Sequence, residues 1–217
     1  IVEADWCIGE LYKTLDNEGL LDNTLIIFSS DNGPVLNDGY YDDAVEKLGD
    51  HTPSGGLRGG KYSLFEAGTK VPFISYWRGK INPGVSNELI SQVDLLNSIS
   101  SIIGSEFKSN DGIDLSDLLL RNKGKGRDHL VVEASTRTAF RKGDWVIIPP
   151  YDAPALNKNV NIELGNSNNF QLYNLEDDPS QKNNLAKIEK EKLKEIYNEF
   201  LKIRGDDFSN IESLILE

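Results

Sequence analysis

The sequence predicts an α/β fold, followed by a small antiparallel sheet that is covered by a C-terminal helix. An amphipathic helix pattern leads through a short turn into an apolar strand, which is the element order of an α/β sheet. Several short strand patterns then follow one another in the C-terminal third of the chain. A last helical pattern comes after them, with apolar residues at three- and four-residue spacing.

The first half is predicted to contain one helix and two strands. Residues 1–20 should form an amphipathic helix, and Gly19 stands where a C-terminal cap is expected. Its apolar positions are Ala4, Ile8, Leu11 and Leu15. Residues 24–30 and 71–77 are short, apolar and rich in β-branched or aromatic side chains, so we expect two strands, the first of them buried. The stretch 33–60 between them has no periodicity and many Gly and Pro residues, which is typical of a functional loop.

A second helix is predicted to begin at Ser91, with Asp94 in the position of the acidic member of a capping box. The side chains expected to face the core are Val93, Leu96, Ile99 and Ile103. The polar stretch 105–128 suggests a boundary, so we divide the chain into a domain of residues 1–122 and a subdomain of residues 123–217.

The subdomain is predicted to contain four strands and one helix. The strands are expected at residues 129–134, 138–141, 145–148 and 170–175, with 157–169 as a loop. Asn184 should cap the final helix, and Gly205 should close it. Its apolar stripe is Leu185, Ile188, Leu193, Ile196, Phe200 and Ile203. The tail from Asp206 is expected to fray.

The charge distribution indicates small anions as ligands. The net charge of −12 argues against nucleic acid as a partner, and no apolar run is long enough to span a membrane. Residues 51–80 nevertheless contain five cations, Arg58, Lys61, Lys70, Arg78 and Lys80, against the single acid Glu66. A basic segment on an acidic protein concentrates small anions.

Asp31 and Asn32 directly follow the first predicted strand. A carboxylate and an amide carbonyl are hard oxygen donors, which suit Ca²⁺, and with less preference Mg²⁺, better than Zn²⁺. Two such residues cannot fill a calcium shell of about six to eight oxygens, so other ligands must come from elsewhere. A simple Asp-Asn-Gly turn is the alternative interpretation of this tripeptide.

Lys61 follows a glycine-rich segment, where the backbone can approach a ligand closely. Its ammonium could bind a sulfuryl or phosphoryl oxygen, and Arg58 is a further candidate for substrate binding. Tyr62 replaces the Ser or Thr of a Walker A loop, so nucleotide binding is excluded. Glu66 could orient either cation. His51 could act as a general acid, or it could be a hydrogen-bonded loop residue.

Together these motifs resemble the type I sulfatases, the formylglycine-dependent arylsulfatases of the alkaline phosphatase superfamily. The order and spacing of the matching pieces give the resemblance its weight, because each piece alone is weak. The pieces are Val2-Glu-Ala-Asp5, Leu20-Leu-Asp-Asn-Thr24, Ile27-Phe-Ser-Ser-Asp-Asn-Gly33, Leu57-Arg-Gly-Gly-Lys61, Glu66-Ala-Gly68, Val71-Pro72, Tyr76-Trp-Arg-Gly79, Thr138 to Trp145, Leu172-Tyr-Asn-Leu175, and Asp178-Pro179 to Asn184-Leu-Ala186.

The resemblance implies the C-terminal part of an alkaline-phosphatase-like mixed sheet with flanking helices, and a sulfuric ester hydrolase activity. It implies that Asp31 and Asn32 are calcium ligands and that Lys61 contacts the sulfate group and the leaving oxygen. It also implies a sulfate ester substrate, such as a sulfated carbohydrate, and a periplasmic or secreted location.

The family nucleophile is a formylglycine made from the first residue of a Cys/Ser-x-Pro-x-Arg motif. Cys7 is followed by Ile8, Gly9 and Glu10, so it is not that motif, and we interpret it as a packing residue. The nucleophile and the first pair of calcium aspartates are expected upstream, in an N-terminal part of the same protein. This chain alone is therefore expected to be inactive. The alternatives are a phosphatase or phosphodiesterase of the same superfamily, or a non-catalytic module that binds sulfated glycans.

Overall fold

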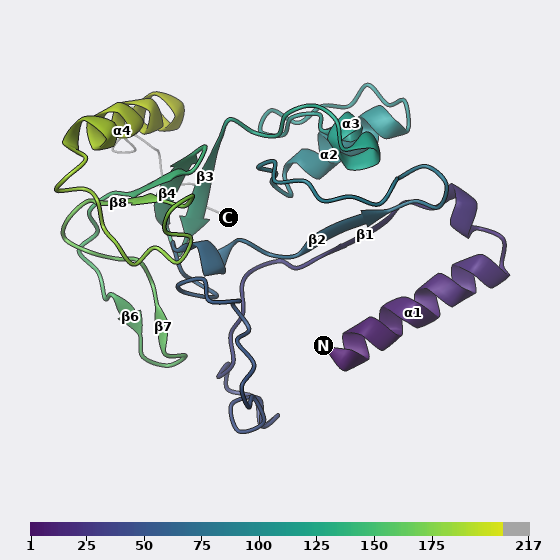
Figure 1. Cartoon of the computed structure of the whole chain (residues 1–217), viewed down its shortest axis with the longest axis horizontal. Helices are drawn as coiled ribbons and strands as arrows, with labels where there is room; N and C mark the ends of the chain where they lie inside the picture. The colour runs from purple at the N-terminus through teal and green to yellow at the C-terminus, as the bar shows by residue number, and fades with distance from the viewer. Residues whose placement is uncertain (206–217) are drawn as a thin grey trace, which may run out of the picture. The chain divides into compact units, whose positions relative to one another are not determined.

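The computed structural model describes residues 1–205, so the prediction for the tail from Asp206 lies outside the described residues (Figure 1). The chain forms two compact units, each made of two separate segments. The first unit contains Ile1–Asp31 and Val71–Leu130. The second contains Asn32–Lys70 and the described residues from Val131 onward. This differs from a division at residue 122, because the segment 32–70 groups with the C-terminal part of the chain.

The first unit contains three helices and a two-stranded antiparallel sheet among its described residues. The sheet pairs β1 (Ile26–Ser29) with β2 (Phe73–Tyr76), and Ile26 lies opposite Tyr76. The helices are α1 (Val2–Asn17), α2 (Asp94–Ile102) and α3 (Ser116–Arg121), and a 3-10 turn, η1 (Leu21–Asn23), follows α1. The sequence did not indicate α3, which lies in the stretch assigned to a polar boundary.

Helix α1 ends as its sequence predicts. Gly19 has a φ of +68°, its N–H donates to the Asp16 carbonyl at 3.0 Å, and the N–H of Leu20 donates to the Leu15 carbonyl at 2.9 Å. These two bonds form a Schellman motif, in which glycine supplies the left-handed residue. No residue of α1 is buried, and Cys7 is exposed, so its assignment as a packing residue is wrong.

The predicted strands are confirmed, but β1 is shorter than expected and is not buried. Phe28 and Ile74 lie opposite each other in the register, and their side chains are 36% and 58% exposed. The physical reason is that β1 pairs only with β2 in the described part of the chain, so the sheet has little to bury it.

Helix α2 turns the opposite face inward from the one expected. Val93 and Leu96 are each 50% exposed and Ile103 is 72% exposed, whereas Asp94 and Ser98 are buried. Ile99 is also exposed. The prediction that these four apolar side chains face the core is therefore wrong.

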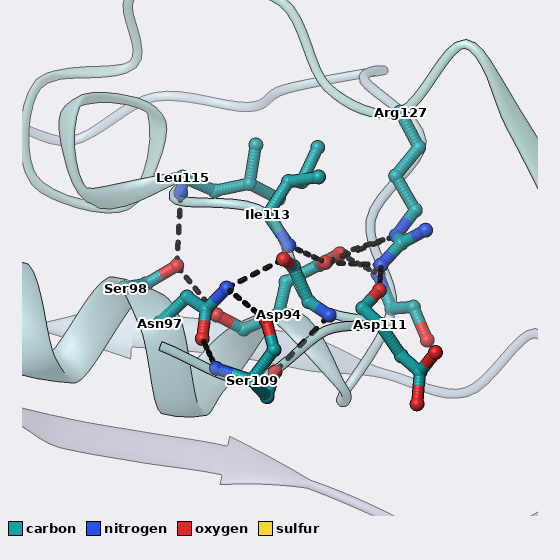
Figure 2. A network of polar contacts seen from close by, with 10 residues as sticks. Asp94, Asn97, Ser98, Ser109, Asp111, Ile113, Leu115 and Arg127 are labelled. Atoms are coloured by element: carbon teal, nitrogen blue, oxygen red, sulfur yellow. Dashed lines mark hydrogen bonds and ion pairs between the residues drawn. The ribbon is translucent and has the colours of Figure 1, made fainter. Parts of the chain in front are cut away.

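The buried polar face of α2 binds the backbone of the loop that follows it (Figure 2). The carboxylate of Asp94 accepts hydrogen bonds from the Ile113 N–H at 2.9 Å and from Arg127 Nε at 2.8 Å. Ser98 Oγ accepts one from the Leu115 N–H at 2.9 Å. The Asp94 carboxylate also accepts from the Ser91 N–H at 2.9 Å, but α2 begins at Asp94 and not at Ser91 as predicted, so this bond ties the preceding turn to the helix instead of closing a capping box. The polar residues fold inward because they satisfy backbone groups that would otherwise be buried unpaired.

The second unit is built on a four-stranded antiparallel sheet, of which Figure 1 labels β3, β4 and β8. The strand order is β3-β4-β5-β8. These strands span His129–Ala134, Arg137–Lys142, Trp145–Ile148 and Gln171–Asn174, so all four predicted strands are confirmed. Two short strands, β6 (Leu156–Asn157) and β7 (Ile162–Glu163), pair with each other in the region expected to be a loop. A 3-10 turn, η2, covers Glu66–Gly68.

Helix α4 (Lys190–Arg204) covers one face of this sheet, as predicted. Phe200 stacks on Phe140 with ring centroids 5.5 Å apart, and Ile147 and Leu172 belong to the same buried cluster. The helix starts later than expected, because Asn184 is engaged elsewhere. Its Oδ1 accepts from the N–H groups of Leu172 and Ala186, so Asn184 ties a turn to β8 instead of capping the helix.

The other face of the sheet holds the segment that carries the candidate site. Leu64 and Phe65 are buried in one cluster with Ile148 and Tyr173, and the rings of Phe65 and Tyr173 lie 6.1 Å apart. Alternate strand residues point to opposite faces, so Ile147 packs under α4 while Ile148 packs on this segment. This packing explains why residues 32–70 group with the C-terminal strands.

Candidate functional site

Residues 33–34 lie beside residues 58–70, which we call the Lys61 segment, in the second unit. The N–H of Lys61 donates to the Pro34 carbonyl at 3.0 Å, and the N–H of Gly33 donates to the Gly68 carbonyl at 2.8 Å. The first residues of the long loop 33–60 are therefore joined by backbone hydrogen bonds to the chain that follows the loop.

Glycines make this close approach possible. A Cβ added to Gly60 would lie 2.6 Å from the Pro34 carbonyl oxygen, and one added to Gly33 would lie 1.6 Å from that of Ala67. Both distances are shorter than real Cβ contacts, so only glycine fits at these positions. The glycine-rich sequence around Lys61 thus has a structural cause, which is the pairing of two backbone segments.

The ammonium of Lys61 remains available to an anion. The residue is partly buried, and its Nζ lies 5.5 Å from the centroid of the Tyr62 ring. It makes no ion pair with any carboxylate in the part of the chain that the structure describes. A cation on a fixed backbone without a carboxylate partner is suited to bind a sulfuryl oxygen.

The structure places Arg58 against protein groups. Its Nε and Nη2 donate to the two carboxylate oxygens of Glu163 at 2.9 and 2.7 Å, and its Nη1 donates to the Gln181 carbonyl at 2.8 Å. The guanidinium also lies 4.1 Å from the centroid of the Phe65 ring. The hydrogen bonds from Arg58 lower the pKa of Glu163, and the same bonds raise the pKa of Arg58.

Glu66 orients neither Lys61 nor Arg58. Its carboxylate pairs with Arg141 at 3.2 Å, and its N–H donates to Gln181 Oε1 at 2.7 Å. The prediction that Glu66 orients Lys61 or Arg58 is therefore wrong. Sequence reasoning also missed Glu163 and Gln181, because neither lies in a pattern that points to Arg58.

Asp31 and Asn32 follow β1 as predicted and are consecutive, although the two compact units divide between them. Asp31 is exposed, and its Oδ1 lies 3.4 Å from Ser30 Oγ. The side-chain amide of Asn32 donates to the Gly33 carbonyl at 3.0 Å, which orients the amide group. Gln92 Nε2 donates to the carbonyl of Ser30, so Gln92 supports the chain just before Asp31.

The side-chain oxygens of Asp31 and Asn32 are of the type that a hard divalent ion prefers, but two residues are too few to complete its coordination shell. Within residues 1–205, no group of three or more His, Cys, Asp or Glu residues is placed to hold a metal ion. The assignment of calcium to this pair stays a prediction.

The loop 33–60 contains His51 and lines a pocket. The imidazole of His51 is exposed, and within residues 1–205 its hydrogen bond is that of the backbone N–H, which donates to the Leu48 carbonyl at 3.2 Å. The pocket has a volume of about 380 Å³ and a mostly apolar lining that includes Pro34, Leu36 and Ile162. It also includes Gly59, two residues from Lys61, so a hollow lies beside the lysine segment.

Comparison with known proteins gives the class of this chain. Residues 1–105 match the family model described as sulfatase. The N-acetylgalactosamine-6-O-sulfatase of Bacteroides thetaiotaomicron is 44% identical over 200 residues, which cover 90% of this chain and 39% of that relative. Human arylsulfatase A is 37% identical over 122 residues, which cover 55% of this chain and 22% of that relative.

Solved structures agree with this assignment. A Bacteroides thetaiotaomicron structure, described in connection with the metabolism of multiple glycosaminoglycans, superposes with a TM-score of 0.88 at 41% identity, covering 93% of this chain and 43% of that one. A Pseudoalteromonas sulfatase gives a TM-score of 0.71 at 30% identity, covering 94% and 41%. The chain belongs to the sulfatase family, and its predicted mixed α/β fold class is confirmed.

The chain spans well under half of the length of these relatives. Among the described residues, no helix combines the length and the apolar character that crossing a bilayer requires.

Proposed function

We propose that this chain supplies half of a site that hydrolyses sulfate esters. The observation that supports this most directly is the pair of backbone hydrogen bonds that joins Gly33 and Pro34 to the Lys61 segment. These bonds fix the lysine next to the segment that begins with Asn32. Family membership gives the arrangement its chemical interpretation, because the relatives are sulfatases.

Lys61 is proposed to bind the sulfate group and to stabilise negative charge on the leaving oxygen. A preorganised cation acts most strongly where charge develops in the transition state, and it needs no reorganisation when the reaction occurs. The absence of an ion pair at Lys61 within residues 1–205 supports this role, since no described carboxylate competes with the sulfate.

Asp31 and Asn32 are proposed to hold Ca²⁺, with Mg²⁺ as the less suitable ion. Their oxygens match the preference of calcium for hard ligands, and further ligands must come from another part of the protein. A bound calcium ion would supply positive charge toward the sulfuryl oxygens.

The nucleophile is proposed to be a formylglycine outside this sequence, which contains no Cys/Ser-x-Pro-x-Arg motif. We therefore expect the 217-residue chain to bind sulfate without turnover. His51 remains a candidate general acid. Its loop contributes Val45 and Pro53 to the pocket lining, whereas His51 is not one of the lining residues, so the role rests on the chemistry of the imidazole.

The substrate is proposed to be a sulfated carbohydrate, since a relative with 44% identity is an N-acetylgalactosamine-6-O-sulfatase. The mostly apolar pocket beside the Lys61 segment could accept an uncharged part of the sugar. We further propose a periplasmic or secreted location, on family resemblance.

Sulfate titration of the chain tests this proposal. Isothermal titration with inorganic sulfate, with and without Ca²⁺, should show binding that Lys61→Ala removes. Lys70→Ala is the matched control, because Lys70 is an exposed lysine of the same segment. Equal binding by wild type and Lys61→Ala contradicts the proposal. Binding of phosphate in preference to sulfate favours a phosphatase, and calcium-independent glycan binding that survives Lys61→Ala favours a non-catalytic module. Aryl sulfate turnover above background would show that the nucleophile lies within this chain.

A further inference from the structure

The segment that carries Lys61 is held from two sides. On one side, Lys61 itself bonds to Pro34 through its backbone. On the other side, Arg58 attaches the start of the segment to residues that are far away in the sequence. The glycines between Arg58 and Lys61 give this stretch a freedom that other residues would not have. Its position therefore depends on the two anchors.

The guanidinium of Arg58 is occupied by protein acceptors. Its fork binds both carboxylate oxygens of Glu163 in β7, and its remaining terminal nitrogen binds the carbonyl of Gln181. The ring of Phe65 covers it at 4.1 Å. The Arg58 side chain is 30% exposed. A guanidinium with these contacts offers few donors to a substrate.

The acceptors that bind Arg58 also hold the other end of the segment. Gln181 is fully buried, and its Oε1 accepts from the N–H of Glu66 at 2.7 Å. Leu164, the neighbour of Glu163, accepts from the N–H of Leu64 at 3.0 Å. The stretch from Arg58 to Glu66 is thus fixed to Glu163 in β7, to Leu164 and to Gln181, and Lys61 lies between the points of attachment.

We propose that Arg58 is a positioning residue that holds the sulfate-binding Lys61 in place through Glu163 and the Gln181 carbonyl, and that it does not bind the substrate itself. This inference rests on the proposed role of Lys61. It replaces the expectation from sequence that Arg58 contacts the sulfate. It also gives the C-terminal subdomain a function, because that subdomain supplies the acceptors that set the position of the lysine.

Amide hydrogen exchange tests the positioning directly, without any need for turnover. The N–H groups of Lys61 and Leu64 are hydrogen-bonded and should be protected in the wild-type chain. Arg58→Lys keeps the charge but loses the bidentate fork, and Glu163→Gln removes the charge of the acceptor. We expect both variants to speed exchange at Lys61 and Leu64 by about tenfold, the effect of losing one charge-assisted hydrogen bond. The N–H of Val146 in β5 serves as the internal reference.

Sulfate titration supplies the second measurement. Arg58→Lys and Glu163→Gln should weaken sulfate binding by about tenfold, through displacement of Lys61. The charge-reversed pair Arg58→Glu with Glu163→Arg should recover part of the loss. Arg121→Lys is the matched control, because Arg121 forms an exposed pair with Asp117.

The outcomes separate the two proposals. Unchanged exchange at Lys61 together with lost sulfate binding in Arg58→Lys would mean that Arg58 binds sulfate directly, which overturns the inference. Equal acceleration at Val146 would mean general destabilisation, which also overturns it. If wild type and Lys61→Ala bind sulfate equally, the proposed function fails, whereas the exchange data still decide whether Arg58 fixes the segment.

Discussion

Removal of the Asp94 carboxylate should destabilise the first unit more than any surface charge change. The side chains of Asp94 and Arg127 are 3% and 12% exposed. The carboxylate also accepts from the backbone N–H of Ile113 (Figure 2) and from that of Ser91. Asp94→Ala leaves a buried guanidinium and two backbone donors without their partner. Breaking a buried pair on one side costs about 3 to 5 kcal/mol.

In a chain of this size, each kcal/mol lowers the melting temperature by about 2 to 4 °C. Asp94→Ala should therefore lower it by about 6 to 20 °C in thermal unfolding followed by circular dichroism. The matched control is Asp117→Ala, which breaks the exposed pair with Arg121 and should cost at most about 0.5 kcal/mol. Equal shifts in the two variants would contradict this prediction, because they would mean that leaving buried donors without a partner costs no more than losing an exposed ion pair.

Three further predictions concern the second unit and helix α1. Arg58 lowers the folded-state pKa of Glu163 below its unfolded value, so this pair should stabilise the chain above the unfolded pKa and lose that effect as pH falls through the folded pKa. Urea unfolding across that range should show a smaller pH dependence in Glu163→Gln, and an unchanged profile would contradict the linkage. Gly60→Ala should cost about 1 to 3 kcal/mol in urea unfolding, because its Cβ would press on the Pro34 carbonyl; an unchanged midpoint would show that the backbone can move apart. Gly9→Ala should instead raise the stability of α1 by about 0.5 to 1 kcal/mol, since nothing lies within 4 Å of the new Cβ, and helicity by circular dichroism checks the gain.

Much of the fold could be predicted because its local signals agree with its tertiary packing. The four strands of the C-terminal sheet and the helix over it follow from apolar periodicity, and Gly19 marks the end of α1. Helix α2 shows where such reasoning fails. Its apolar stripe would mark the buried face if apolar side chains were the ones buried. Asp94 and Ser98 are buried instead, because the N–H groups of the following loop need acceptors.

The sequence indicated the candidate site residues but not the residues that hold them in position. Asp31, Asn32 and Lys61 lie in recognisable motifs, and the glycines beside Lys61 pointed to a close backbone approach. The partners Glu163 and Gln181 follow no local pattern, because their contacts with Arg58 span more than a hundred residues. Only tertiary structure shows that the fork of Arg58 is already filled.

Two backbone hydrogen bonds fix the ends of the loop 33–60, so the position of these ends does not depend on the length of the loop. Each doubling in length of a flexible loop costs only about 0.6 kcal/mol in closure entropy. Insertions, deletions or a grafted peptide between these anchors can therefore reshape the rim of the pocket while the backbone of Lys61 stays in place. One stretch of chain can therefore be exchanged to change the walls of this hollow while the backbone around Lys61 keeps its place.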